Sequence, residues 1–429
     1  MTIKFKKSNE LFKKVSKIIP LASQTFSKSY LQFIKGRAPL FLTRGKDRRV
    51  YDVDGNEYID FINGLLAIIL GYQYPAVDQA IKKQLKQGLN FSLASELEYE
   101  LALLLKKYIP CAEMVRFGKN GSDVTAGAIR LARAVTGRSQ VALCGYHGWH
   151  DWSIGTTAKK LGVPEETQKL SHVFRYNDLN SLKDLFKKYP GKIAAVIMEP
   201  MNYIEPEKNF LARVKELAHK NGAVLIFDEI ITGFRFNLGG AQKLFGVIPD
   251  LATFGKSMAN GMQISALVGR AKYMKRAEDI FYSFTFGGEA LSLAAAIATI
   301  KEMKKKNVIG YIWQLGAYLQ SGATKLIKKH GLDEIIKIKG KPCWQVFIVS
   351  PTKKYSDLEI KSYLQQELLQ KGFLWYGQHN MSFSHKPSDI DRLLRAYDEI
   401  FRQLRKFLDS GSLQKNLKGE PITNIFKVR

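Results

Sequence analysis

The sequence predicts an α/β protein with two domains, a large one built on a mainly parallel sheet and a smaller α+β one. The chain has 429 residues, which exceeds the size of one ordinary domain. From about residue 61 to 300, short apolar runs alternate with helical patterns, as in βαβ units. A long helical pattern then begins near residue 305. We therefore expect a large domain at 61–304 and a small domain with a polar tail at 305–429.

The individual elements follow from apolar runs and helical periodicity. Residues 1–60 show a helical pattern, a connector and a hairpin with an Asp54-Gly55 turn, and we expect them to join the small domain. In the large domain, strands are expected at 141–144, 194–198, 223–227 and 266–269, and helices at 96–108, 125–136 and 209–221. In the small domain, a strand is expected at 344–350 and helices at 356–371 and 387–408.

The composition limits the possible compartments and partners. The chain carries 66 basic and 39 acidic residues, a net charge of +27, which fits either a polyanionic partner or a lysine-rich surface. The lysines are spread along the chain without a nucleic-acid-binding motif, so we expect no nucleic-acid partner; they could still attract an anionic substrate. Three scattered cysteines indicate a reducing compartment, the cytoplasm. The longest apolar run, near 65–70, is too short to cross a membrane.

Two residues point to the chemistry. Asp228 ends the apolar run Ala223-Val-Leu-Ile-Phe, which reads as a buried strand delivering a carboxylate to its C-terminal end. Lys256 follows 28 positions later, after a second such strand and among small residues. Pyridoxal phosphate (PLP) needs such a pair, because a lysine amine holds its aldehyde as a Schiff base and an aspartate keeps its ring nitrogen protonated. The alternatives are a helix N-cap for Asp228 and a surface lysine for Lys256.

Several motifs, taken in order, resemble one protein family. They are Ser8–Pro20, Tyr51–Asp60, Arg116–Asp123, Tyr146–Asp151, the two stretches around Asp228 and Lys256, Gly239-Gly-Ala-Gln, Thr285-Phe-Gly-Gly and His385–Asp391. Together they resemble the class III PLP-dependent aminotransferases, and within them the glutamate-1-semialdehyde aminomutase-like branch. The resemblance implies a fold-type I PLP-dependent transferase with a seven-stranded sheet in the large domain.

Gly121 and Ser122 open a helical pattern and are the candidates for binding the cofactor phosphate. Backbone N–H groups and the helix dipole at such an end favour an anion, and the Ser122 hydroxyl adds a donor. The alternative is a plain turn with an N-cap. The family usually has Glu-Ala where this chain has Asp123-Val124.

The resemblance assigns the two faces of the cofactor ring to Tyr146, which would stack on one, and Ile230, which would press the other. Tyr146 follows an expected strand, at the edge where open α/β sheets bind ligands. It could also be an ordinary amphipathic aromatic residue. His147 and His150 suggest a metal, but no acidic or cysteine ligands accompany them with ligand spacing, so we expect no metal site.

Thr285 resembles the family residue that reaches the cofactor phosphate of a neighbouring subunit. This implies a homodimer with shared active sites. The alternative is that Thr285 caps a helix beginning near Ala290. The family usually continues with Asn-Pro or His-Pro, where this chain has Glu289-Ala290.

The main indications of the substrate are residues that differ from the usual pattern of the family. Glu199-Pro200 is present, but residues 377–385 lack the arginine that clamps an α-carboxylate in many relatives. Residues 23–29 offer Lys28 where the aminomutases use an arginine, and lysine is not a bidentate carboxylate clamp. We therefore expect an aminotransferase acting between an amino donor and a small aldehyde or ketone. The alternatives are an aminomutase that shifts an amino group within one molecule, and a basic binding protein without catalysis.

Overall fold

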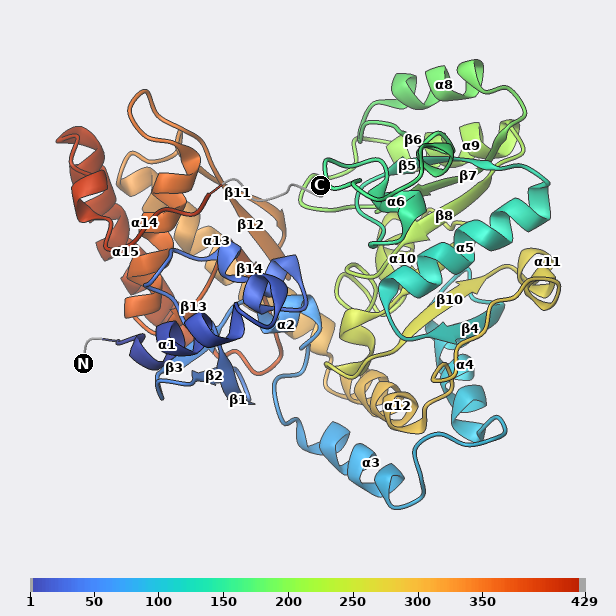
Figure 1. Cartoon of the computed structure of the whole chain (residues 1–429), viewed down its shortest axis with the longest axis horizontal. Helices are drawn as coiled ribbons and strands as arrows, with labels where there is room; N and C mark the ends of the chain where they lie inside the picture. The colour runs from blue at the N-terminus through green and yellow to red at the C-terminus, as the bar shows by residue number, and fades with distance from the viewer. Residues whose placement is uncertain (1–2, 424–429) are drawn as a thin grey trace. The chain divides into compact units, whose positions relative to one another are not determined.

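The computed structural model describes residues 3–423, which fall into two compact units (Figure 1). The small unit contains the chain up to Tyr74 and resumes at Gly310, and the large unit is Pro75–Ile309. The end of the expected tail, 424–429, lies outside the described residues.

The large unit is built on a seven-stranded sheet with the order β4-β10-β9-β8-β7-β5-β6. Its strands are β4 (Met114–Gly118), β5 (Gln140–Cys144), β6 (Ser171–Val173), β7 (Ile193–Met198), β8 (Val224–Asp228), β9 (Leu251–Phe254) and β10 (Ser265–Gly269). Strands β6, β5, β7, β8 and β9 pair in parallel, while β10 is antiparallel to both of its neighbours. The expected mainly parallel seven-stranded sheet is therefore confirmed.

The direction of β10 follows from its short connection. Only ten residues separate β9 from β10, and a parallel crossover needs a dozen or more, usually with a helix. Every residue of β7, β8, β9 and β10 is buried, as expected for strands covered on both faces.

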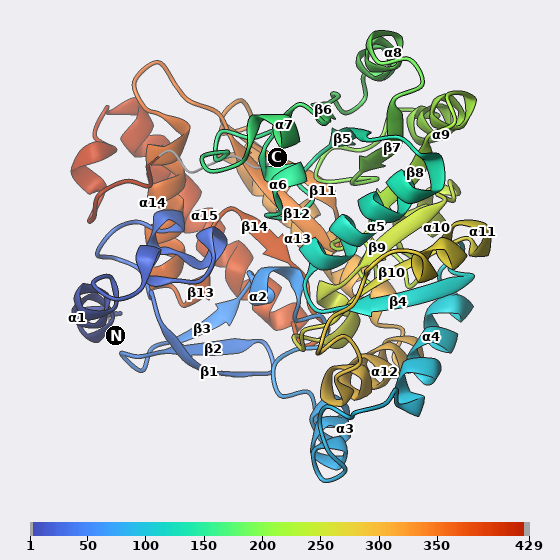
Figure 2. The same ribbon diagram turned by 45° about the vertical axis from the view of Figure 1, so that its right-hand side comes forward.

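Helices surround this sheet. They are α3 (Pro75–Leu85), α4 (Glu96–Tyr108), α5 (Gly121–Thr136), α6 (Asp151–Ile154), α7 (Glu165–Gln168), α8 (Leu179–Lys188), α9 (Phe210–Lys220), α10 (Gly240–Phe245), α11 (Ala271–Met274) and α12 (Ala290–Lys305). Helix α5 packs across β4, β10, β9, β8 and β7, as Figures 1 and 2 show. This places the N-terminus of α5 beside the loops that follow β5, β8 and β9.

The small unit combines both ends of the chain. It contains α1 (Lys6–Val15), β1 (Leu42–Lys46), β2 (Arg49–Asp52), β3 (Glu57–Asp60), α2 (Asn63–Leu66), most of α13 (Val308–Lys329), β11 (Ile336–Lys341), β12 (Trp344–Val349), α14 (Asp357–Gln370), β13 (Phe373–Leu374), β14 (Gln378–Asn380) and α15 (Pro387–Asp409). Its sheets have the orders β1-β2-β3-β13 and β11-β12-β14. Strand β13 pairs in parallel with β3 and so joins the N-terminal hairpin to the C-terminal part.

The first helix differs from the sequence-based expectation. The motif Ser8–Pro20, which resembles the first helix of the family branch, was expected to be helical up to Pro20, but α1 ends at Val15 and Pro20 begins a short 3₁₀ turn. A proline disfavours helical backbone in the residue before it, which explains why the helix does not continue to this point. Among residues 3–423, no helix has the length and apolarity needed to span a membrane.

Candidate active site

Asp228 is the last residue of β8, and its carboxylate is almost fully buried. Its Oδ1 accepts hydrogen bonds from the Ile230 N–H at 3.1 Å and from the Thr253 hydroxyl on neighbouring β9 at 3.3 Å. Its Oδ2 lies 2.8 Å from His147 Nδ1. A buried carboxylate is costly unless it is paired, and these contacts hold it at the C-terminal edge of the sheet. No helix begins here, so the N-cap alternative for Asp228 is wrong.

His147 is a site residue whose role the sequence analysis missed. Its Nε2 lies 3.2 Å from the Cys144 carbonyl, so both ring nitrogens face oxygen acceptors. These two contacts fix the His147 ring between the end of β5 and the Asp228 carboxylate, and so hold that carboxylate in place. The signal that could have found it was the position of His147 beside Tyr146, directly after a strand. Among the described residues, no group of three or more His, Cys, Asp or Glu side chains is placed to hold a metal ion.

The loop that carries Tyr146 and His147 is hydrogen-bonded to the first two turns of α5. The Thr125 hydroxyl donates to the His147 carbonyl at 2.7 Å, and the Trp149 N–H donates to Ser122 Oγ at 3.2 Å. Gly148 has φ +106°, and a Cβ added there would lie 2.3 Å from Ser122 Oγ. The close approach therefore requires glycine, and it brings the expected ring-stacking loop against the expected phosphate turn.

Ile230 connects three of the expected site segments. A Cβ at Gly121 or at Gly255 would lie 3.3 Å from Ile230 Cδ1, so this side chain packs against the first residue of α5 and the residue before Lys256. Lys256 itself is half-buried and has φ +43°, in the left-handed region that non-glycine residues rarely adopt. Such backbone strain concentrates at functional sites. The structure thus brings Gly121, Ile230 and Lys256 together at one edge of the sheet.

The turn before α5 is stabilised by its own residues. Asp123 Oδ2 accepts from the backbone N–H groups of Lys119 at 3.0 Å and Asn120 at 2.7 Å. The Ser265 hydroxyl on β10 donates to the Asn120 carbonyl at 2.8 Å. The carboxylate that replaces the usual family glutamate therefore braces the turn. The N–H groups of Gly121 and Ser122, in the first turn of a 16-residue helix, have no intrahelical acceptor.

The Gly239-Gly-Ala-Gln motif surrounds Glu229, which is fully buried. Glu229 accepts from the N–H groups of Ala241 at 2.6 Å and Gln242 at 2.8 Å, and from the Thr232 hydroxyl. A Cβ on Gly240, which has φ +78°, would lie 2.4 Å from Glu229 Oε2. Burial raises the pKa of Glu229 to about 6 although these hydrogen bonds act in the opposite direction. Glu229 thus anchors the segment after Asp228 to α10, a role that the sequence pattern did not reveal.

Thr285 is exposed and is the first residue of a turn at 285–288. The alternative that it caps the following helix is wrong, because Glu289 is the N-cap of α12. The Glu289 carboxylate accepts from the N–H groups of Leu291 at 2.7 Å and Ser292 at 3.2 Å.

These residues fit PLP in three respects. The N-terminus of α5 offers unpaired N–H donors to a phosphate. The Asp228 carboxylate is buried, held by three partners, and retains lone pairs for a ring N–H. The Ile230 side chain, wedged between Gly121 and Gly255, supplies an apolar surface for a ring next to Lys256.

Comparison with known proteins agrees with this arrangement. The aminotransferase class-III family matches residues 33–388. The 3-aminobutyryl-CoA aminotransferase of Cloacimonas acidaminovorans is 36% identical over 419 residues, covering 95% of this chain and 99% of that protein. The glutamate-1-semialdehyde 2,1-aminomutase of Aquifex aeolicus is 33% identical over 401 residues, covering 86% and 93%. The structure of the FumI protein from Sphingopyxis sp. MTA144, which contains PLP, has 28% identity and a TM-score of 0.87, covering 94% and 98%.

Proposed function

Since the chain belongs to the class III aminotransferase family and is therefore a PLP-dependent enzyme, we propose that it moves an amino group between an amino donor and a small aldehyde or ketone. The observation that carries this proposal is the convergence of Asp228, Ile230, Gly121 and Lys256 at the C-terminal edge of the sheet. A binding protein without catalysis would not need a buried acid and a strained lysine at the same edge.

Each residue has a role in this proposal. Bound PLP supplies an electron-accepting ring that stabilises negative charge on the substrate carbon. Asp228, held by His147, keeps the proton on the ring nitrogen, and Ile230 presses one ring face. The Lys256 amine would hold the cofactor through its aldehyde, and when free it would serve as the base and acid that moves the proton of the substrate carbon.

The remaining two roles complete the binding of the cofactor. Tyr146 covers the ring face opposite Ile230. Gly121 and Ser122 bind the phosphate through their N–H groups and the Ser122 hydroxyl. Both roles are supported by the hydrogen bonds of Thr125 and Ser122 to the loop that carries Tyr146, because these bonds place that loop beside the start of α5.

Two observations favour amino transfer over an intramolecular amino shift. The segment that contains Lys28 has no arginine, although the aminomutases use one there to bind the substrate carboxylate. A relative that aligns over almost its whole length is named as an aminotransferase acting on 3-aminobutyryl-CoA. That substrate carries its amino group beside no free carboxylate, which agrees with a chain that lacks the carboxylate clamps.

The decisive experiment is a screen of amino donors with the purified holoenzyme. We expect turnover of aldehyde or ketone acceptors to require a separate donor, and the donor to convert the bound cofactor to its amino form when no acceptor is present. Conversion of glutamate-1-semialdehyde without any donor would instead establish the aminomutase alternative. Three free, buried cysteines support a reducing compartment, and we place the enzyme in the cytoplasm.

The active unit in this proposal is a homodimer in which Thr285 binds the partner's cofactor phosphate. Thr285 is exposed beside Phe286, which is 58% exposed, and the nearby loop carries Leu93 at 85% exposure. The Ala290 N–H donates to the Leu89 carbonyl at 2.8 Å, which joins this loop to the end of the Thr285 turn. Large exposed apolar side chains in one region mark an interface.

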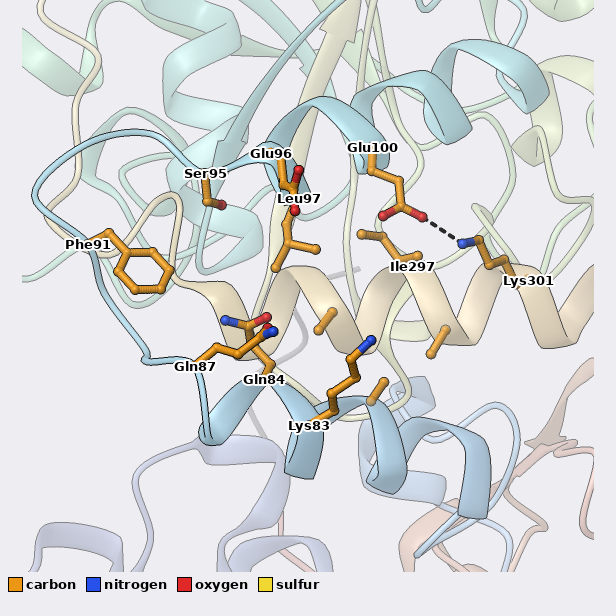
Figure 3. A pocket seen from close by; sticks show the side chains of 13 residues that line it. Lys83, Gln84, Gln87, Phe91, Ser95, Glu96, Leu97, Glu100, Ile297 and Lys301 are labelled. Carbon is orange, nitrogen blue, oxygen red and sulfur yellow. Dashed lines mark hydrogen bonds and ion pairs between the residues drawn. The ribbon is translucent and has the colours of Figure 1, made fainter.

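A groove of about 630 Å³ adjoins this region, between α3, α4 and α12. Figure 3 shows Phe91 at one end of it, and Glu100 and Lys301 paired across α4 and α12 at 2.6 Å. We assign this face to a second copy of the chain. Sedimentation of the holoenzyme should give a dimer, and a monomer with full activity would contradict the shared site.

A further inference from the structure

The Lys119–Glu289 ion pair links the turn before α5 to the end of the Thr285 turn. Lys119 Nζ lies 3.0 Å from Glu289 Oε2 and 3.2 Å from Ser292 Oγ, and Ser292 Oγ in turn donates to Glu289 at 2.6 Å. Both charged side chains are only 16% exposed. Burial acts to raise the pKa of Glu289, but the hydrogen bonds from Ser292 and Lys119 outweigh it and lower that pKa, so the carboxylate is ionised at neutral pH.

The two ends of this pair belong to segments with different tasks. Lys119 precedes Gly121 by two residues, and its own N–H is fixed by Asp123 at 3.0 Å. Glu289 follows Thr285 by four residues and is the N-cap of α12. In the proposed dimer, the first segment binds the phosphate of its own subunit's cofactor, whereas Thr285 binds that of the partner. The pair therefore joins two cofactor sites within one chain.

The Thr285 turn also has a second constraint at its base. A Cβ on Gly288 would lie 2.5 Å from Glu98 Oε1, so the backbone runs close against the start of α4. Contacts at Gly288 and Glu289 thus fix the C-terminal end of the turn, while Thr285 and Phe286 project into solvent. The orientation of Thr285 depends on how firmly that end is held.

We propose that Lys119 and Glu289 form a positioning pair that sets the Thr285 turn for the partner's cofactor phosphate, so that breaking the pair weakens cofactor binding in the other subunit. This inference rests on the shared site proposed above. It concerns a departure from the usual pattern of the resembling family, which has Asn-Pro or His-Pro where Glu289-Ala290 stands. A partly buried pair with two additional hydrogen bonds contributes more than an exposed one.

The test uses mixed dimers, separated by two affinity tags, in which one subunit carries Lys256→Ala. Only the other subunit can then hold the cofactor covalently and turn over. Glu289→Gln is placed either on the Lys256→Ala subunit or on the Lys256-bearing subunit. Glutamine keeps an oxygen for the Leu291 N–H but removes the charge. The readout is the rate at which the visible absorbance of the Lys256-bound cofactor is lost during dialysis, measured alongside activity.

We expect cofactor loss to be about tenfold faster when Glu289→Gln lies on the Lys256→Ala subunit, and close to the parent rate in the other arrangement. Lys119→Met should behave in the same way, without a further loss when combined with Glu289→Gln. The control is Asp279→Asn, which breaks the exposed ion pair with Arg276 in the same unit and should change neither rate. Three results would overturn the proposal. They are an equal rate of cofactor loss in both arrangements, faster loss only when Glu289→Gln lies on the Lys256-bearing subunit, and no change in the rate in either arrangement.

Thr285→Val, placed in the same two arrangements, separates this inference from the shared site itself. If Thr285→Val on the Lys256→Ala subunit speeds cofactor loss from the other subunit and Glu289→Gln does not, the proposed positioning role of the pair is wrong and the shared site stands. If Thr285→Val acts only within its own subunit, the shared site is wrong.

Discussion

The contact between Gly148 and the first turn of α5 makes Gly148→Ala the most informative substitution in the site. The Cβ of alanine would lie 2.3 Å from Ser122 Oγ and 2.9 Å from Ser122 Cα, whereas ordinary contacts begin at 3.4 Å. The serine hydroxyl can rotate, but the Cα atom belongs to the backbone of the proposed phosphate turn. Either this turn or the loop carrying Tyr146 and His147 must therefore move by several tenths of an ångström or more.

Two costs add in this variant. A left-handed backbone costs an L-residue roughly 1–2 kcal/mol, and forcing extra volume into a packed contact costs about 1–3 kcal/mol. We expect the free energy of unfolding to fall by about 2–5 kcal/mol. Because the displaced segments would hold the phosphate and the His147–Asp228 pair, PLP should bind at least about tenfold more weakly, which corresponds to 1.4 kcal/mol.

Gly162→Ala is the matched control for this substitution. Gly162 has φ +88° and no atom within 4 Å of an added Cβ, so its alanine variant carries the backbone cost alone. PLP affinity is measured by titrating each apoenzyme and following absorbance, and stability by chemical denaturation. A folded Gly148→Ala protein with unchanged PLP affinity would refute the claim that these two segments jointly bind the cofactor.

Three further predictions test individual side chains. Lys256→Ala should abolish turnover and the visible absorbance of a lysine-bound cofactor, and near-normal activity would remove Lys256 from the mechanism. Asp228→Asn should retain some PLP but lower kcat more than tenfold, since an amide cannot hold the ring proton; a smaller loss disagrees with the assigned role. Glu229 has its pKa raised from 4.5 to about 6, so its protonated form favours the folded state, and the free energy of unfolding should fall by about 2 kcal/mol as pH rises from below 4.5 to above 6. In Glu229→Gln this contribution should be absent from the pH dependence measured by urea denaturation.

Much of the fold followed from local patterns along the chain. The run Ala223-Val-Leu-Ile-Phe and its neighbours read as buried strands because such strands, covered on both faces, need continuous apolar side chains. The antiparallel direction of β10 was not evident from its residues, because Ala266-Leu-Val-Gly is equally apolar in either direction. The length of the connection after β9 carried that information.

In the candidate active site, too, some features followed from local sequence patterns and others only from the tertiary structure. The sequence determined the residue types and their order: an acid after one apolar strand, a lysine after another, and a small-residue turn opening a helix. Only the tertiary structure decided which atoms meet. His147 attracted notice as a metal ligand, yet it pairs with an aspartate 81 residues away. The motif Gly239-Gly-Ala-Gln had no assigned purpose until it was found around Glu229. These contacts join segments that are far apart in the sequence. They depend on how the segments pack in the folded chain, which a local sequence pattern does not specify.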